Sequence, residues 1–545
     1  MVELINHGVY LLNGTEIRDN YQGMTPDEAR ENTITYGILR SHDVDGGKGN
    51  KMRIRFDAMM SHDITYVGII QTARASGLEE FPLPYAMTNC HNSLCAVGGT
   101  INEDDHVFGL SAAKKYGGIY VPANQAVIHQ YAREMMVKCG NMILGSDSHT
   151  RYGSLGNMGV GEGGGELVKQ LLKNTWDINA PEVVLVWLEG APKKGIGPHD
   201  VAISLVKATF ESGVVKNKVL EFAGPGVKNL PIDFRNGIDI MTTETTCLSS
   251  IWITDDEVKH HYEIHERPQD YRELKPGDVA YYDMMIRIDL STQESMIALP
   301  FHPSNAVTIH ELQADPVGIL TRIEEDAKKR FGDKVDVHLV DKVVDGKVQA
   351  DQGIIAGCSG GTYDNLAEAA AILKGKNIGN DYFTASAYPQ STPVSMAVTR
   401  EGITADLIEA GVVMKPAFCG PCFGAGDVPS NNGLSIRHTT RNFPNREGSK
   451  PGQGQLSLVA LMDARSIAAT AANGGIITAA TDVEYENTHK PYVYDDKIYK
   501  CRVYNGFGKA RPETELRYGP NIKDWPKMYP MQENMLVELA AVIHD

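Results

Sequence analysis

Apolar runs that end in polar residues alternate along the chain with segments whose apolar residues recur at helical spacing. Residues 141–150, NMILGSDSHT, predict a buried strand, and residues 165–174, GELVKQLLKN, predict a helix. The next pair repeats this order, with a strand over 181–190 and a helix over 199–213 that has Asp200 as its N-cap and Gly213 as its stop. This alternation predicts several α/β domains.

Polar stretches marked by Gly and Pro indicate where these domains join. The stretch GAPKKGIGPHD near 191–200 is one joint, the charged stretch 254–276 is typical of a surface insertion, and residues 508–530 are typical of a linker. After that linker, NMLVELAAVIHD begins a new apolar segment and the chain ends. This favours a further domain downstream over a short terminal helix or strand docked on the body.

Composition and charge narrow the class of protein. The 545 residues carry a formal net charge of −17, which argues against broad binding to nucleic acid or anionic membranes because those partners select basic surfaces. No apolar run reaches membrane-spanning length, and the N-terminus lacks the features of a secretory signal. Eight cysteines are too few for a disulfide scaffold of this length, so we expect free thiols in a reducing cytoplasm.

The cysteines supply the first candidate chemistry. The stretch CGPCFG places Cys419 and Cys422 in a tight turn, which is open to three interpretations: a redox dithiol, half of a zinc site, or part of an iron–sulfur cluster. The surrounding residues predict a loop, not the helix start that a redox pair needs. Structural zinc needs further close ligands, and the sequence offers only the pair His260–His261 in a polar segment.

A third cysteine, Cys358, lies in a similar glycine-rich turn between an apolar strand and a helix, where backbone N–H groups favour an anionic ligand. Three such thiolates can hold a [4Fe–4S] cluster and leave one iron open for Lewis-acid chemistry. We interpret the remaining cysteines as core or surface thiols: Cys90, Cys95, Cys139, Cys247 and Cys501.

Five motifs, AVIHQ, GSDSHT, GCSGGTYDN, CGPCFG and RNFPNR, occur in the order of the aconitase superfamily, which the chain resembles over about residues 30–530. The resemblance implies three α/β domains around an iron–sulfur site, over 1–200, 201–320 and 321–507. Residues 508–545 would be a linker and the start of a mobile swivel domain. The resemblance places the serine base and further substrate-binding arginines in that fourth domain, supplied in cis or as a second subunit.

The resemblance also assigns roles to individual residues. It makes Cys358, Cys419 and Cys422 the cluster ligands. The implied catalytic residues are His129, Asp147, His149 and Glu244, and the implied substrate-binding residues are His62, Ser148, Arg441 and Arg446.

The chemistry of these residue types fits a dehydration without reference to the family. Loss of water needs a base for the C–H proton and an acid for the hydroxyl, and an imidazole paired with a carboxylate can be that acid. His129 with Asp147, and His149 with Glu244, are the candidate pairs. Arginine binds a carboxylate through two nitrogens. Taken singly, each histidine is more simply structural and RNFPNR an ordinary loop; their co-occurrence with the cysteine motifs favours an active site.

Several positions depart from the family pattern. Asn92 and Ser93 stand where the family has an Asp–His pair, so either His91 compensates or the substrate differs. Gly360 and Thr440 stand where asparagines are common. These changes make citrate a poor default substrate, and the chain looks more like the uncharacterised hydratases of the superfamily.

Two functional classes follow. The first is a hydro-lyase for a small hydroxy di- or tricarboxylic acid, and the second is a non-catalytic, iron-sensing RNA-binding protein of the same family. The net charge of −17 and the set of histidines and carboxylates favour the enzyme. The stretch GVGEGG at 159–164 matches a dinucleotide-binding pattern only formally, because no strand directly precedes it.

Overall fold

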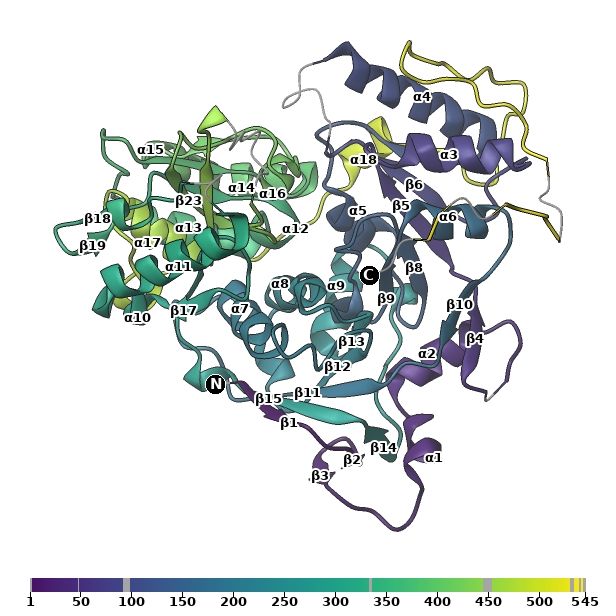
Figure 1. The fold of residues 1–545 in the computed structure, drawn as a ribbon, viewed down its shortest axis with the longest axis horizontal. Helices are drawn as coiled ribbons and strands as arrows, with labels where there is room; N and C mark the ends of the chain where they lie inside the picture. The colour runs from purple at the N-terminus through teal and green to yellow at the C-terminus, as the bar shows by residue number, and fades with distance from the viewer. Residues whose placement is uncertain are drawn as a thin grey trace.

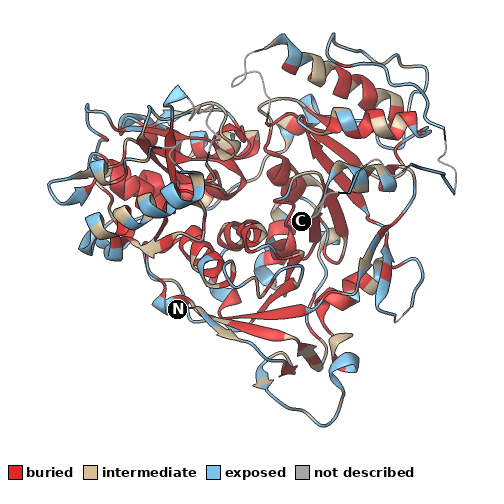
Figure 2. Ribbon diagram, viewed as in Figure 1, coloured by how far each residue is buried: buried red, intermediate tan, exposed pale blue. Residues whose placement is uncertain are grey.

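Three β-sheets, each covered by helices, organise the chain (Figure 1). The computed structural model describes residues 2–47, 49–91, 99–332, 336–444, 453–529, 534–538 and 541–542. The strands of all three sheets are largely buried, and exposed residues gather on the outer helices and loops (Figure 2). The mixed α/β class predicted from the alternating pattern is confirmed.

The first sheet has the order β25-β7-β6-β5-β8-β9. Five of its six strands are parallel: β5 (Ala58–His62), β6 (Tyr85–Thr88), β7 (Ile119–Val121), β8 (Met142–Gly145) and β9 (Met158–Gly161). The short β25 (Tyr504–Asn505) pairs antiparallel with β7 at the edge. The associated helices are α3 (Tyr66–Ala75), α4 (Thr100–Tyr116), α5 (Ile128–Met135) and α6 (Gly164–Leu171). The strand order reverses between β5 and β8, so the first sheet has a topological switch point there.

The second sheet has the order β1-β15-β11-β12-β13. The strands are β1 (Val2–Ile5), β11 (Val183–Glu189), β12 (Val219–Ala223), β13 (Ser249–Trp252) and β15 (Met284–Asp289). All neighbours are parallel except β1, which runs antiparallel to β15. Helices α7 (Pro198–Thr209), α8 (Ile232–Met241) and α9 (Asp256–Ile264) belong to this unit, at the centre of Figure 1.

The third sheet has the order β17-β16-β24-β23-β20-β21-β22. Its parallel strands are β20 (Gln352–Ile355), β21 (Thr384–Ala387), β22 (Val413–Met414), β23 (Gly433–His438) and β24 (Ser457–Met462). Two strands run antiparallel to their neighbours: β16 (Met296–Ala298), which pairs with β24, and β17 (Ala306–Thr308), which pairs with β16 at the edge. Its helices are α10 (Ile309–Ala314), α11 (Pro316–Phe331), α12 (Gly357–Gly360), α13 (Tyr363–Leu373), α14 (Thr392–Arg400), α15 (Ile403–Glu409), α16 (Gly420–Phe423) and α17 (Ala464–Ala472). A second switch point lies between β20 and β23.

Smaller elements connect these units. The remaining strands are β2 (Val9–Leu12), β3 (Glu16–Arg18), β4 (Lys51–Ile54), β10 (Trp176–Asn179), β14 (Val279–Tyr282), β18 (Val343–Val344) and β19 (Lys347–Val348). The remaining α-helices are α1 (Pro26–Arg30), α2 (Ile34–His42) and α18 (Lys497–Arg502). Short 3₁₀ turns include η1 (Gly153–Leu155) and η3 (Thr242–Thr245).

The hydrophobic pattern predicted the type of these helices and strands correctly, but it predicted their first and last residues less accurately. The strand expected over 181–190 is β11, and the helix expected over 165–174 is α6. The N-cap of α7 is Gly197, not Asp200; the Asp200 side chain accepts from the Gly197 N–H at 2.9 Å as the third residue of the helix. The helix ends at Thr209 and not at Gly213, which lies in a following turn with a φ of +62°.

The segment 254–276 is not a surface insertion. It contains α9, whose Val258 and Tyr262 are fully buried. Arg267 donates to the backbone oxygen of Glu134 at 2.9 Å, so the segment packs against α5. Its charged residues obscured this role, because the buried positions are spaced along one face of a short helix.

Residues 508–529 run in an extended path along α3 and α4, as the yellow segment of Figure 1 shows. Arg74 pairs with Asp524, and the Arg517 N–H donates to Ser111 Oγ at 3.0 Å. The predicted domain limits at 200, 320 and 507 stay predictions, and the three sheets take their strands from 58–161, 183–289 and 296–462 apart from β1 and β25. Among the described residues, no helix is long and apolar enough to cross a membrane.

Candidate active site

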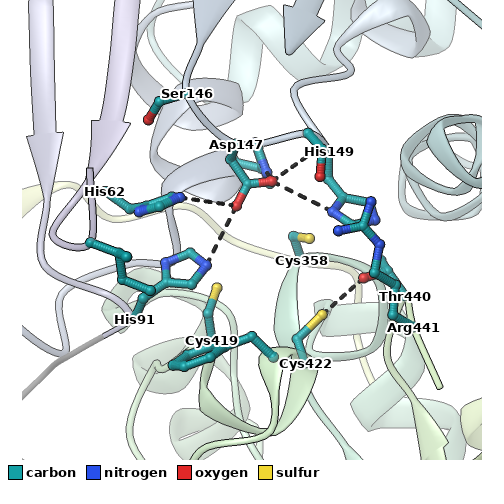
Figure 3. A pocket seen from close by; sticks show the side chains of 14 residues that line it. His62, His91, Ser146, Asp147, His149, Cys358, Cys419, Cys422, Thr440 and Arg441 are labelled. Atoms are coloured by element: carbon teal, nitrogen blue, oxygen red, sulfur yellow. Dashed lines mark hydrogen bonds and ion pairs between the residues drawn. The ribbon is translucent and has the colours of Figure 1, made fainter. Parts of the chain in front are cut away.

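The predicted site residues stand at the carboxyl ends of parallel strands that border the two switch points. His62 ends β5 and Asp147 follows β8 by two residues, on either side of the first switch point. Cys358 follows β20 and Arg441 follows β23, on either side of the second. Ligands of open α/β sheets bind at such places. Here both sets of loops line one cavity of about 360 Å³ (Figure 3).

The three predicted cluster cysteines lie on the wall contributed by the third sheet. Cys358 lies in α12, just after Gly357, whose φ of +73° a residue with a side chain would adopt only with strain. Cys419 is the N-cap of α16 and Cys422 lies within this helix, so the turn predicted as a loop contains one short helical turn. Cys422 Sγ is 2.9 Å from Thr440 Oγ1. Figure 3 shows the three sulfurs around the same space.

The chemistry of this donor set fits a thiophilic metal cluster. Burial and the neighbouring Cys422 raise the pKa of Cys358 well above its usual value. A hydrogen bond with Cys90, burial and the nearby sulfurs do the same to the pKa of Cys419. Such thiols keep their protons until a cation replaces them, and three convergent sulfurs are soft ligands of the kind that hold iron–sulfur clusters.

Four imidazoles surround the carboxylate of Asp147. Its Oδ1 lies 3.2 Å from His129 Nε2 and 3.5 Å from His149 Nδ1, and it accepts the His149 backbone N–H at 2.8 Å. Its Oδ2 lies 3.4 Å from His91 Nε2 and 3.7 Å from His62 Nε2. Burial alone would raise the pKa of Asp147, but these partners, His129 foremost, hold it well below its usual value. The side chain is therefore a buried carboxylate.

Three of these imidazoles, those of His62, His91 and His129, differ in their pKa. Burial, with the charge of His91 beside it, lowers the pKa of His62 to about 3, and burial also lowers the pKa of His129. Burial opposes protonation of His91 too, but Cys90 and Asp147 outweigh it and raise the His91 pKa well above its usual value. The directions of these pKa shifts favour His91, more than His129, as the protonated imidazole beside Asp147.

Glu244 joins the three units of the fold. It lies in η3, next to the second sheet, and its Oε1 is 2.7 Å from His149 Nε2 and 2.8 Å from Arg441 Nε. Burial would raise the pKa of Glu244, but Arg441 and His149 together lower it. Because His149 belongs to the first unit and Arg441 to the third, one carboxylate oxygen fixes the position of both side chains at the cavity.

The structure brings together every predicted site residue that it describes. Glu244 lies behind the cavity wall, and the others line the cavity: His62, His129, Asp147, Ser148, His149, Cys358, Cys419, Cys422 and Arg441. Arg446, Asn92 and Ser93 lie outside the described residues. Sequence reasoning did not place Phe423 or Ile64 at the cavity, because isolated apolar residues carry no motif.

One of the departures from the family pattern, Gly360, has a physical reason. A side chain at Gly360 would place its Cβ 2.2 Å from the backbone oxygen of His438, so asparagine cannot replace this glycine without a shift of the backbone. Thr440 contacts Cys422 Sγ with a hydroxyl in place of an amide. Cys90, interpreted from the sequence as a core or surface thiol, is fully buried and lies next to His91, with Sγ and Nδ1 3.3 Å apart.

Comparisons with known proteins agree with this geometry. The sequence profile of the aconitase family (aconitate hydratase) matches residues 36–469. The 3-isopropylmalate dehydratase large subunit of Elusimicrobium minutum is 27% identical over 343 residues, which cover 62% of this chain and 73% of that protein. Large subunit 1 of the same dehydratase from Thermotoga maritima is 25% identical over 431 residues, which cover 78% and 94%. The mitochondrial aconitate hydratase of Schizosaccharomyces pombe is 26% identical over 471 residues, and the chain spans only 56% of its length.

Proposed function

Because the chain belongs to the aconitase family, we propose that it is the hydro-lyase of a small hydroxy di- or tricarboxylic acid. The observation that carries the proposal is one cavity lined by Cys358, Cys419 and Cys422 on one wall and by the imidazoles around Asp147 on the other. We propose that the three thiolates hold a [4Fe–4S] cluster. When bound, this cluster supplies a Lewis-acidic iron with an open coordination position.

The residues of the chain orient the substrate and deliver a proton to its departing hydroxyl group. Arg441 donates to Glu244 through Nε, so the other edge of its guanidinium can donate two hydrogen bonds to a substrate carboxylate. His91, with Asp147 beside it, can deliver the proton that converts the departing hydroxyl into water. Deprotonation of the neighbouring carbon needs a base as well, and the family resemblance places that base, a serine, in a fourth domain.

We further propose that a second subunit or a further domain completes the site. The relatives from Elusimicrobium and Thermotoga are named large subunits, which favours a partner chain. The iron-sensing, RNA-binding alternative has no specific support in the fold, and the net charge of −17 opposes it.

Anaerobic reconstitution tests the cluster directly. Wild-type protein should take up about four irons per chain with broad visible absorption, and Cys358→Ser should not. Cys139→Ser is a matched control, because Cys139 is a buried thiol that does not line the cavity. Equal iron uptake by wild type and Cys358→Ser would show that the cluster assignment is wrong.

Activity is then measured by screening the reconstituted protein, with its partner subunit, against hydroxy di- and tricarboxylic acids under anaerobic conditions. Reversible hydration or dehydration of at least one acid is expected. Loaded protein that turns over none of them with the partner present would contradict the hydro-lyase assignment, whatever the state of the cluster.

A further inference from the structure

The chain has a second cluster of metal-binding side chains that overlaps the proposed cluster site at one thiol. The ligand atoms of Cys90, His91 and Cys419 all lie within 4.8 Å of one another, and all three residues are buried. We propose that these residues bind a thiophilic divalent ion, Zn²⁺ in the first place, when the iron–sulfur cluster is absent. The inference rests on the proposed function only in assigning Cys419 to the cluster as well.

The backbone holds the two cysteines together. Cys90 follows β6, and its backbone oxygen accepts the Cys419 N–H at 2.8 Å, which ties the loop of the first unit to α16 of the third. In a tetrahedral zinc site with Zn–S near 2.3 Å and Zn–N near 2.1 Å, ligand atoms are about 3.5–3.8 Å apart. His91 Nδ1 already lies 3.3 Å from Cys90 Sγ. Small side-chain movements therefore suffice to close the site.

His91 has the supporting contacts of a metal ligand. With Nδ1 toward the sulfurs, its Nε2 faces Asp147 Oδ2 at 3.4 Å, and a carboxylate on the far nitrogen is the usual partner of a metal-bound imidazole. Its backbone N–H donates to Asp63 Oδ1 at 2.9 Å. The ring lies between His62 and Phe423, with ring centroids 4.1 and 5.1 Å away. The imidazole is thus fixed in position before any ion binds.

The charge and donor types select the ion. Binding displaces the protons carried by His91 and the thiols, and two thiolates with a neutral imidazole balance a 2+ ion, so the set of ligands and ion is electrically neutral. Two sulfurs and a nitrogen suit Zn²⁺ and not Mg²⁺ or Ca²⁺. His62, Asp63 and His91 form a second group of possible metal ligands, which contains no sulfur. The experiment must therefore distinguish an ion bound by sulfur from an ion bound by this group.

The two metal sites share Cys419, so a zinc ion held by this thiolate competes with the cluster for one of its three proposed ligands. Cys358 and Cys422 belong only to the cluster, and Cys90 and His91 only to the second site. Zinc bound at the second site should therefore block assembly of the cluster, although it does not bind the other two cluster thiols, Cys358 and Cys422. This difference provides variants that separate the sites.

The experiment uses cluster-free, full-length protein under anaerobic conditions, titrated with Zn²⁺ against a chromogenic chelator and separately with Co²⁺. Wild type should bind one ion per chain, and the Co²⁺ form should show thiolate-to-cobalt charge transfer. Cys90→Ser should lose at least about 100-fold in Zn²⁺ affinity, because loss of a ligand costs more than loss of a supporting partner. Cys358→Ser and Cys139→Ser should keep the wild-type affinity.

Wild-type affinity in Cys90→Ser would overturn the proposal, as would a Co²⁺ spectrum without sulfur charge transfer. Equal losses in Cys358→Ser and Cys419→Ser would also overturn it, because the ion would then sit on the cluster thiols. His91→Ala is a second variant with the same expectation as Cys90→Ser, and thermal melting identifies any variant that fails to fold. Failure here leaves iron uptake by the wild type unaffected, so it is distinguishable from failure of the proposed function.

Discussion

Arg441 shows how one residue can be tested apart from the cluster. Its Nε is engaged by Glu244, and its charge faces the cavity. Arg441→Lys keeps the charge but loses the planar fork, so kcat/KM of the complete enzyme should fall by the equivalent of about 2–5 kcal/mol while iron uptake stays normal.

The control for this variant is Arg400→Lys, because Arg400 is an exposed arginine that donates to Asp495 and does not line the cavity. Normal kcat/KM in Arg441→Lys would show that RNFPNR is an ordinary loop. A loss of iron uptake in this variant would instead assign Arg441 to the assembly of the site.

Residues within motifs were predictable because their chemistry needs fixed residue types at fixed spacings. Cys358, Cys419 and Cys422 are examples, since each lies in a glycine-containing turn at a strand end. Cys90 and His91 were not predictable as partners of Cys419, because 328 residues separate His91 from Cys419 and no local pattern connects them. Their proximity comes from the docking of two sheets.

At the scale of elements, α5 is the clearest case in which the sequence was insufficient. Seven of its eight residues are buried, including Arg133 and Glu134, because the helix lies between the first and third units. Arg133 Nη1 donates to the Cys358 backbone oxygen at 3.0 Å. Periodicity predicts a polar face toward water, but tertiary packing covers this face with hydrogen-bonding partners.

Glu134 gives this helix a pH-dependent contribution to stability. Burial raises its pKa to about 7, although the hydroxyls of Tyr499 and Ser391 donate to it. The folded state thus binds this proton more tightly than the unfolded state, so the contribution is complete below about pH 4.5 and is lost as the pH rises through 7.

Glu134→Gln removes the titration. The free energy of unfolding of the wild type should fall from pH 5 to pH 8 as Glu134 loses its proton, and that of the variant should lack this fall. The difference between variant and wild type should therefore change in favour of the variant, by on the order of 3 kcal/mol at most. Thermal melting at both pH values measures this, with the exposed Glu325→Gln as the control. A difference from wild type that is the same at both pH values would contradict the assignment.

At the scale of the whole molecule, we predict that catalytic activity depends on the proposed partner subunit or swivel domain. Residues 1–545 alone, loaded with the proposed cluster, should bind hydroxy acids weakly and turn them over negligibly. The reason is that the catalytic base is expected in a swivel domain outside these residues. Adding the partner subunit, or a chain extended by the swivel domain, should restore turnover. Steady-state kinetics across a titration of the partner measures this, and robust turnover by residues 1–545 alone would show that the base lies within this chain.

The contact of Glu244 with His149 and Arg441 has a consequence for biosynthesis. Glu244 leaves the ribosome 197 residues before Arg441. At about 5–20 residues per second, roughly 10 to 40 seconds pass between them. For that interval the nascent chain carries imidazoles and carboxylates whose cationic partner has not yet been translated. Cys422, the last of the three proposed cluster ligands, is synthesised 19 residues before Arg441, so the iron centre proposed above can be completed only after residue 422 has been synthesised.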